Sequence, residues 1–198
     1  MNINNTFWSR SLKSLTLILI TTSMVVFYSC GNDDEPTPEN EEELITTLTM
    51  TFSNIIETTD VVVAQFRDID GEGGQPPTFI QPTLKANGVY NAEIELLNES
   101  VTPPTDISAE VLEEGTQHQF FFSSSDNSLL SFSYLDSDRN GFPIGLSTRW
   151  EMNDTGTATF VVILRHMPDK DATGVSDGGI ANAEGNTDIE VSFDLTIE

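Results

Sequence analysis

Alternation of apolar and polar residues is the feature that most constrains the fold of this chain. From Leu44 onward, apolar side chains take every second position in one segment after another, as in Leu48, Met50 and Phe52 with threonines between them. A period of two is typical of strands with one buried and one solvated face, which antiparallel sheets provide. The segments with the clearest alternation are 47–52, 90–96, 130–134, 144–152 and 189–197.

Other segments have the composition of strands without the same regularity. Asn87-Gly88 and Asn140-Gly141 separate some of these segments and favour tight turns, because Asn and Gly tolerate positive φ angles. The less regular segments are residues 61–67, 79–85, 119–123 and 157–166. Together with the five regular segments they give about nine expected strands.

One short helix interrupts the strands. Asp106 is a suitable N-cap for a helix from Ile107 to Glu114, and Gly115 is a suitable end. A parallel sheet would require strands and helices in alternation, and the sequence lacks this pattern. The sequence therefore predicts an all-β fold over residues 44–198, an immunoglobulin-like antiparallel β-sandwich, with a small barrel as the alternative.

The first 29 residues have the order of charges and apolar residues found in a secretory signal. Arg10 and Lys13 precede an apolar run at residues 15–28. A helix of these residues would be about 21 Å long, shorter than the roughly 30 Å hydrocarbon core of a bilayer. We therefore expect residues 1–29 to be a cleaved signal peptide.

Ser29-Cys30-Gly31 follows this leader and resembles the lipobox of bacterial lipoproteins. The resemblance implies that Cys30 becomes the lipidated N-terminal residue, and a free cysteine near a cleavage site is the alternative. Residues 30–43 are rich in acidic residues and proline, so an acidic disordered tether is expected. Asp33, Asp34 and Glu35 resemble a surface-export signal of Bacteroidota lipoproteins, although a plain spacer fits them nearly as well.

Two further segments resemble small lipoproteins of Bacteroidota, of the flavobacterial type. These are residues 111–121, VLEEGTQHQFF, and residues 165–171, RHMPDKD. Some of these relatives carry the label "type 1 periplasmic binding fold superfamily", and some are encoded near TonB-dependent receptors. The resemblance implies an outer-membrane lipoprotein, exposed at the cell surface or facing the periplasm, with a TonB-dependent receptor as its partner.

Charge excludes several classes of partner. The chain has 32 acidic and 8 basic residues, with a formal net charge of −24. Nucleic acid and anionic membrane surfaces would repel it, so membrane attachment is expected through a lipid anchor. The sequence has no nucleophile elbow, phosphate-binding loop or HExxH motif, so we do not expect an enzyme.

The two histidines of the chain are candidate ligands of a transition metal. Each is expected at a strand end, His118 beside Glu114 and His166 near Asp169. Two imidazoles with carboxylates suit zinc or copper. The alternative is that each histidine only caps a strand or bonds a loop.

Two acidic loops resemble the start of a calcium site. Asp136, Asp138 and Asn140 occupy alternate positions before Gly141, as in an EF-hand loop, but the closing glutamate is missing. Asp68 and Asp70 form a shorter cluster. The alternatives are a hairpin turn for the first loop and a flexible acidic loop for the second.

These expectations define two hypotheses of function. The first is a non-enzymatic ligand-binding module on a cell-envelope lipoprotein, which binds a transition metal in support of a transporter. The second is a structural or adhesive surface protein whose acidic loops are stabilised by calcium. Zinc or copper is expected as the ligand before calcium.

Overall fold

The computed structural model describes residues 44–71 and 73–198. This part of the chain forms a sandwich of two sheets with eleven strands, one α-helix and one short 3-10 helix. The strands are β1 (Thr47–Asn54), β2 (Val61–Arg67), β3 (Thr78–Ile80), β4 (Thr83–Leu84), β5 (Val89–Asn98), β6 (Thr105–Asp106), β7 (His118–Ser124), β8 (Leu130–Tyr134), β9 (Ser147–Met152), β10 (Gly156–His166) and β11 (Asn186–Ile197). The helices are α2 (Ile107–Glu113) and η1 (Ile180–Asn182).

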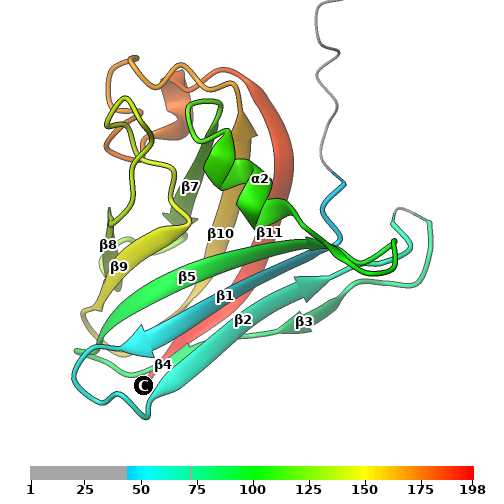
Figure 1. The fold of residues 1–198 in the computed structure, drawn as a ribbon. Helices are drawn as coiled ribbons and strands as arrows, with labels where there is room; N and C mark the ends of the chain where they lie inside the picture. Colours follow the sequence, from blue (N-terminus) through cyan, green and yellow to red (C-terminus); the bar gives the residue numbers. More distant parts are fainter. Residues whose placement is uncertain (1–43, 72) are drawn as a thin grey trace, which may run out of the picture. The chain divides into compact units, whose positions relative to one another are not determined.

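The two sheets differ in size. The larger has the strand order β3-β2-β1-β5-β9-β8, with β6 paired to β5, and the smaller has the order β4-β11-β10-β7. β4 pairs with β11 in parallel, and the other described strand pairs are antiparallel. In Figure 1, β7, β10 and β11 lie behind β1, β2 and β5, and α2 lies near one end of the sandwich.

The core between the sheets is centred on Trp150. Its ring contacts Phe52 and Phe132 of the larger sheet and Phe122 and Phe160 of the smaller sheet, with ring centroids 5.0 to 6.1 Å apart. The indole N–H donates to Thr148 Oγ1 at 2.8 Å, so its polar atom is satisfied inside the core. Each fully buried aromatic side chain stabilises the fold by about 1.5 to 3 kcal/mol, which ties the two sheets together.

Helix α2 forms where the sequence predicts it. The Asp106 side chain accepts a hydrogen bond from the Ala109 N–H at 3.3 Å, as an N-cap does. Ile107 and Val111 are buried against the core. The helix ends with Glu114 as its C-cap, so the carboxyl end of α2 lies directly before β7.

The structure confirms the predicted all-β sandwich but not the expected count of nine strands. The segment 79–85 is split at Gln81-Pro82: β3 before it pairs with β2 in one sheet, and β4 after it pairs with β11 in the other. Pro82 has no N–H to donate to a ladder, which explains a break at this point. The two-residue β6 accounts for the other added strand.

The strand expected over 144–152 begins later than predicted. Ile144 and Leu146 are buried, but they lie in a loop and β9 starts at Ser147. The Asp136 carboxylate accepts hydrogen bonds from the Gly145 and Ser147 N–H groups at 2.7 and 3.0 Å. The Asp136 side chain therefore binds backbone N–H groups that would otherwise pair with a neighbouring strand. The alternation of apolar residues does not reveal this contact.

Candidate metal centre

The two histidines meet at one end of the smaller sheet. His118 is the first residue of β7, His166 is the last residue of β10, and the two are paired across the antiparallel ladder. Each continues the core-facing row of its strand, His118 with Phe120 and His166 with Leu164. Their ring centroids lie 4.7 Å apart, and the residues are 0 and 6 % exposed. The structure thus brings the two imidazoles together in the interior, as a shared site requires.

Asp188 of β11 is the third member of this cluster, and a β-bulge places it there. The register of β10 and β11 pairs Leu164 with Ile189 but Arg165 with Thr187, so Asp188 is the extra residue of β11. The side chain of Asp188 is fully buried. Bulges commonly redirect one side chain next to a functional site, and this bulge supplies a carboxylate to the histidines.

Gly185 allows β11 to begin so close to His166. It has a φ of 68°, and a Cβ atom at this position would lie 2.3 Å from the His166 carbonyl oxygen. A larger residue would push the start of β11 away from the end of β10. Glycine at this position therefore helps to hold Asp188 beside the histidines.

The separations within the cluster suit ligands that share one ion. His118 Nε2 lies 3.8 Å from Asp188 Oδ2, and His166 Nδ1 lies 3.7 Å from Asp188 Oδ1. One ligand atom from each of the three residues lies within 4.8 Å of the others. Hydrogen bonds are shorter than these separations, whereas two ligands about 2.1 Å from one ion are about 3.4 to 3.6 Å apart.

The Glu114 carbonyl determines which nitrogen of His118 faces Asp188. His118 Nδ1 lies 3.3 Å from this carbonyl oxygen, and a carbonyl only accepts, so Nδ1 carries the proton in this contact. In the neutral ring, Nε2 then presents a lone pair toward the carboxylate of Asp188. Two acceptors that face each other form a favourable place for a cation, and a backbone carbonyl on the other ring nitrogen is typical of histidines that bind metals.

Burial keeps His118 neutral. Burial is the largest cause of a pKa of about 4 for this residue; the charge of His166 lowers it further, the hydrogen bond with Glu114 opposes the change, and the charge of Lys170 lowers it again. At pH 7 the imidazole is therefore in the form that binds metals.

The carboxylates expected to assist the histidines do not belong to this cluster. The side chain of Glu114 is exposed, and this residue contributes only its backbone carbonyl. Asp169 is exposed and accepts a hydrogen bond from the Asp171 N–H at 3.2 Å. Neither is among the side chains that converge with the histidines, so the structure replaces both with Asp188.

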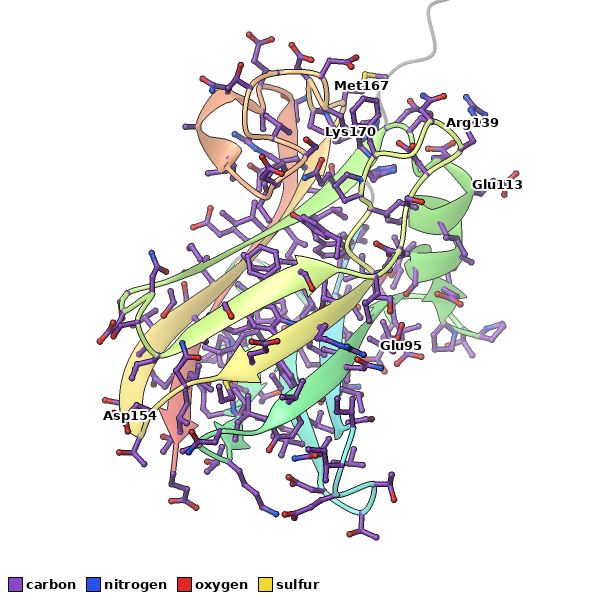
Figure 2. All side chains as sticks on the ribbon, turned by 90° about the vertical axis from the view of Figure 1, so that its left-hand side faces the viewer. Glu95, Glu113, Arg139, Asp154, Met167 and Lys170 are labelled. Atoms are coloured by element: carbon purple, nitrogen blue, oxygen red, sulfur yellow. The ribbon has the colours of Figure 1, made fainter. Side chains whose placement is uncertain are left out.

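The first calcium-like loop is held by a lysine. Lys170 is buried, and its ammonium group donates to the carbonyls of Gly115 and Pro143 and to Asp138 Oδ2 at 2.6, 2.8 and 3.1 Å. Figure 2 shows Lys170 at the upper end of the sandwich, near the loop that carries Arg139. A cation of the chain itself thus sits beside the carboxylate that was expected to bind calcium.

The other carboxylate oxygens of Asp136 and Asp138 accept hydrogen bonds from backbone N–H groups. Asp138 Oδ1 accepts from the N–H groups of Asn140 and Phe142, while Asp136 binds backbone N–H groups at the entry to β9. Burial alone would raise the pKa of Asp138, but the hydrogen bonds from Lys170 and these amides lower it. The geometry favours the hairpin-turn interpretation of Asp136, Asp138 and Asn140.

Asp68 and Asp70 lie in an exposed loop between β2 and β3. Asp68 Oδ1 accepts from the Gly71 N–H at 3.0 Å, and Asp70 Oδ2 accepts from the Gln75 N–H at 2.9 Å. Among the residues that the structure describes, neither belongs to a group of three converging ligand side chains. This arrangement is that of local turns.

The predictions for the N-terminal part fall on residues that lie outside the described ones. They include the signal peptide at 1–29, the lipidation site Cys30 and the tether at 30–43. In the described part, 44–71 and 73–198, no helix is long and apolar enough to cross a membrane.

Comparisons with known proteins add no family or function. No protein-family model matches the chain, and no curated protein matches it.

Proposed function

We propose that this protein is a non-enzymatic metal-binding lipoprotein of the cell envelope, which holds one zinc or copper ion between His118, His166 and Asp188. The observation that carries the proposal is the convergence of two imidazoles and one carboxylate from three adjacent strands, at separations of 3.7 and 3.8 Å between the carboxylate and each ring. Two nitrogen ligands and one oxygen ligand suit these two metals.

Burial of the three side chains favours retention of the ion over rapid exchange. Their exposed fractions are 0, 8 and 0 % for His118, His166 and Asp188. An ion among them is largely shielded from bulk solvent and joins β7, β10 and β11. Three protein ligands leave a fourth position for a water molecule or for a group of a partner.

Metal analysis of the purified protein tests the proposal. The protein is expressed with zinc or copper in the medium, and the bound metal is counted by mass spectrometry after exhaustive dialysis. We expect one ion per chain in the wild type and none in His118→Ala, His166→Ala or Asp188→Asn. Glu190→Gln is the matched control, because Glu190 lies two residues further along β11 and is exposed.

A second pair of variants separates the three ligands from the carboxylates expected from sequence. Glu114→Gln keeps the backbone carbonyl that contacts His118, and Asp169→Asn changes an exposed turn. Both should retain one ion per chain. Loss of the ion in these variants with retention in Asp188→Asn would overturn the assignment of Asp188.

The position in the envelope rests on the sequence of the N-terminal part. The charged and apolar leader followed by Ser29-Cys30-Gly31 supports a lipid anchor on Cys30. Cys30→Ser should move the protein from the membrane pellet to a soluble fraction, because the acyl chains provide the attachment. The protein then presents its metal site near an outer-membrane transporter, of which a TonB-dependent receptor is the proposed example. A substituted protein that stays in the pellet with its leader cleaved would contradict the anchor.

A further inference from the structure

A groove between two strand edges carries an inference that is independent of the metal. β7 is the last strand of the smaller sheet and β8 is the last strand of the larger sheet, so the sandwich is open between them. The groove has a volume of about 240 Å³. Its walls are Phe122, Ser123, Ser124, Asn127, Leu130, Ser131, Phe132 and Trp150.

The groove is short because both of its ends are closed. At one end the Tyr134 hydroxyl donates to the Phe120 carbonyl at 2.7 Å, and the Phe120 N–H donates to the Ile144 carbonyl at 2.7 Å. At the other end residues 125–129 connect β7 directly to β8. A long extended peptide therefore has no path through it, whereas a small ring can enter from the open side.

Backbone groups line both rims. The Phe120 N–H points away from β10. In an antiparallel strand every second residue directs its backbone groups to the same side, so the N–H and C=O groups of residues 122 and 124 face the groove. Just after β8, the Leu135 N–H donates to the carbonyl of Ser147, the first residue of β9. Backbone groups alternate in direction along a strand, so those of residues 130 and 132 point away from β9 and face the groove. These rims offer donors and acceptors of hydrogen bonds at fixed positions.

The floor and the charge of the groove define the ligand. The floor is aromatic, with Phe132 stacked on Trp150 at a centroid distance of 5.0 Å and Phe122 at 5.2 Å from Trp150. None of the eight lining residues is charged, although 32 of the 198 residues of the chain are acidic. A ligand that matches it is a neutral ring with one apolar face and hydroxyl groups at its edge.

From these features we propose that the groove binds one neutral saccharide unit. The apolar face of the sugar lies on Phe132, the half-buried ring of a floor whose other rings, Trp150 and Phe122, are buried. Its hydroxyl groups bond to the backbone rims and to the side chains of Ser123, Asn127 and Ser131. A charged sugar is excluded because no lining side chain can pair with its charge when water is displaced. A ligand of this size in an open groove binds with a dissociation constant of about 1 mM.

Tryptophan fluorescence of the mature lipoprotein in detergent tests this proposal. The sequence has two tryptophans, and Trp8 lies in the expected signal peptide, so the mature protein keeps Trp150 in the floor as its only reporter. Neutral hexoses, N-acetylhexosamines and their disaccharides are titrated, with glucuronate and glucosamine as charged counterparts. We expect a saturable change in Trp150 emission with at least one neutral sugar and none with the charged ones.

Two serines on one side of β8 provide a matched pair of variants. Ser131 and Ser133 are both exposed, but only Ser131 lines the groove. Ser131→Phe should weaken sugar binding at least tenfold, and Ser133→Phe should leave it unchanged. Ser123→Phe, on the opposite rim, should have the effect of Ser131→Phe, and circular dichroism verifies that all three variants are folded.

Three results would overturn the inference. The first is a lack of any saturable change with neutral sugars in the millimolar range. The second is equal binding by Ser131→Phe and Ser133→Phe, which would place the sugar elsewhere. The third is a response of Trp150 to short apolar peptides without a response to sugars. Metal-site variants such as His118→Ala should bind sugar normally, so this test is independent of the proposed metal.

Discussion

Two buried clusters of ionisable side chains in residues 73–198 differ in the distances between their polar atoms. Around Lys170 the contacts to Gly115, Pro143 and Asp138 are 2.6 to 3.1 Å, which are hydrogen bonds. Around Asp188 the contacts to His118 and His166 are 3.8 and 3.7 Å. The first cluster supplies its own cation, whereas the second has the spacing of ligands around one ion.

The comparison separates a structural role from a binding role. An ammonium group has three donors, and Lys170 uses them on three acceptors, so nothing further can bind there. An ionised carboxylate such as that of Asp188 only accepts, and a neutral imidazole offers one acceptor nitrogen, so acceptors that converge here attract a cation. We therefore expect the free energy of unfolding to fall when Lys170 is replaced, and to rise when a metal that binds the second cluster is added.

Removal of the lysine should have the largest effect. Lys170→Met leaves the Asp138 side chain, which is 1 % exposed, without its cationic partner, although two backbone N–H groups still donate to it. Breaking a buried pair in this way costs about 3 to 5 kcal/mol of unfolding free energy, measured by urea denaturation. The double variant Lys170→Met, Asp138→Asn should recover part of the loss, because it removes the uncompensated charge.

An exposed ion pair is the control for this first prediction. Lys85 pairs with Glu57 and Asp60, and its side chain is 51 % exposed. Lys85→Met should cause a much smaller loss, because exposed pairs contribute little. If Lys170→Met is no more harmful than Lys85→Met, the Lys170 cluster does not hold the loops together.

Acid should weaken the metal-free protein through His118. The pKa of His118 is about 4 in the folded chain, against about 6.5 in an unfolded chain. As the pH falls from 6.5 to 4, the unfolded state takes up a proton that the folded state does not, so stability is lost over this range, by about 3 kcal/mol in total.

Denaturation at several pH values with a chelator present measures this slope. Carboxylates also titrate near the lower end of the range, so the difference between the wild type and His118→Phe isolates the histidine. The variant should lose less stability than the wild type between pH 6.5 and 4. Parallel curves for the two proteins would show that His118 titrates normally in the fold.

Added zinc should stabilise the wild type by a slightly smaller amount. A ligand that binds only the folded state at 100 times its dissociation constant adds about 2.7 kcal/mol. Asp188→Asn should lose most of this gain and Glu190→Gln should keep it. A gain in Asp188→Asn equal to that of the wild type would mean that zinc binds elsewhere on this acidic surface.

The sequence predicted much of the sandwich because alternation is a local property. The rows that end in Leu164 and His166 on β10, and in Phe120 and His118 on β7, follow from a period of two. Alternation alone does not say that β7 pairs with β10, which brings the histidines together. That contact depends on long-range pairing between strands more than 30 residues apart.

Asp188 and Lys170 could not be found from the pattern. By period two, Asp188 belongs with Glu190, Ser192 and Asp194 on the solvated face, and only the bulge beside Leu164 turns it inward. Lys170 reaches Asp138 across 32 positions of sequence. The local signal in the sequence is Gly185, a turn-forming residue shortly before Asp188, but its approach to His166 is visible only in the structure.

The smallest expected change in stability concerns α2, because residues at its carboxyl end contact both the metal-site cluster and the Lys170 cluster. The Glu114 carbonyl accepts a hydrogen bond from His118, and the Gly115 carbonyl accepts one from Lys170. Asp106→Ala removes the N-cap at the opposite end of the helix and should cost about 1 kcal/mol, whereas Asp106→Ser should cost little. Since the two clusters hold the carboxyl end independently of the cap, zinc affinity should stay within about threefold of the wild type. A larger loss of affinity in Asp106→Ala at unchanged overall folding would mean that the whole helix positions His118, and that the metal site and the Lys170 cluster act as one unit.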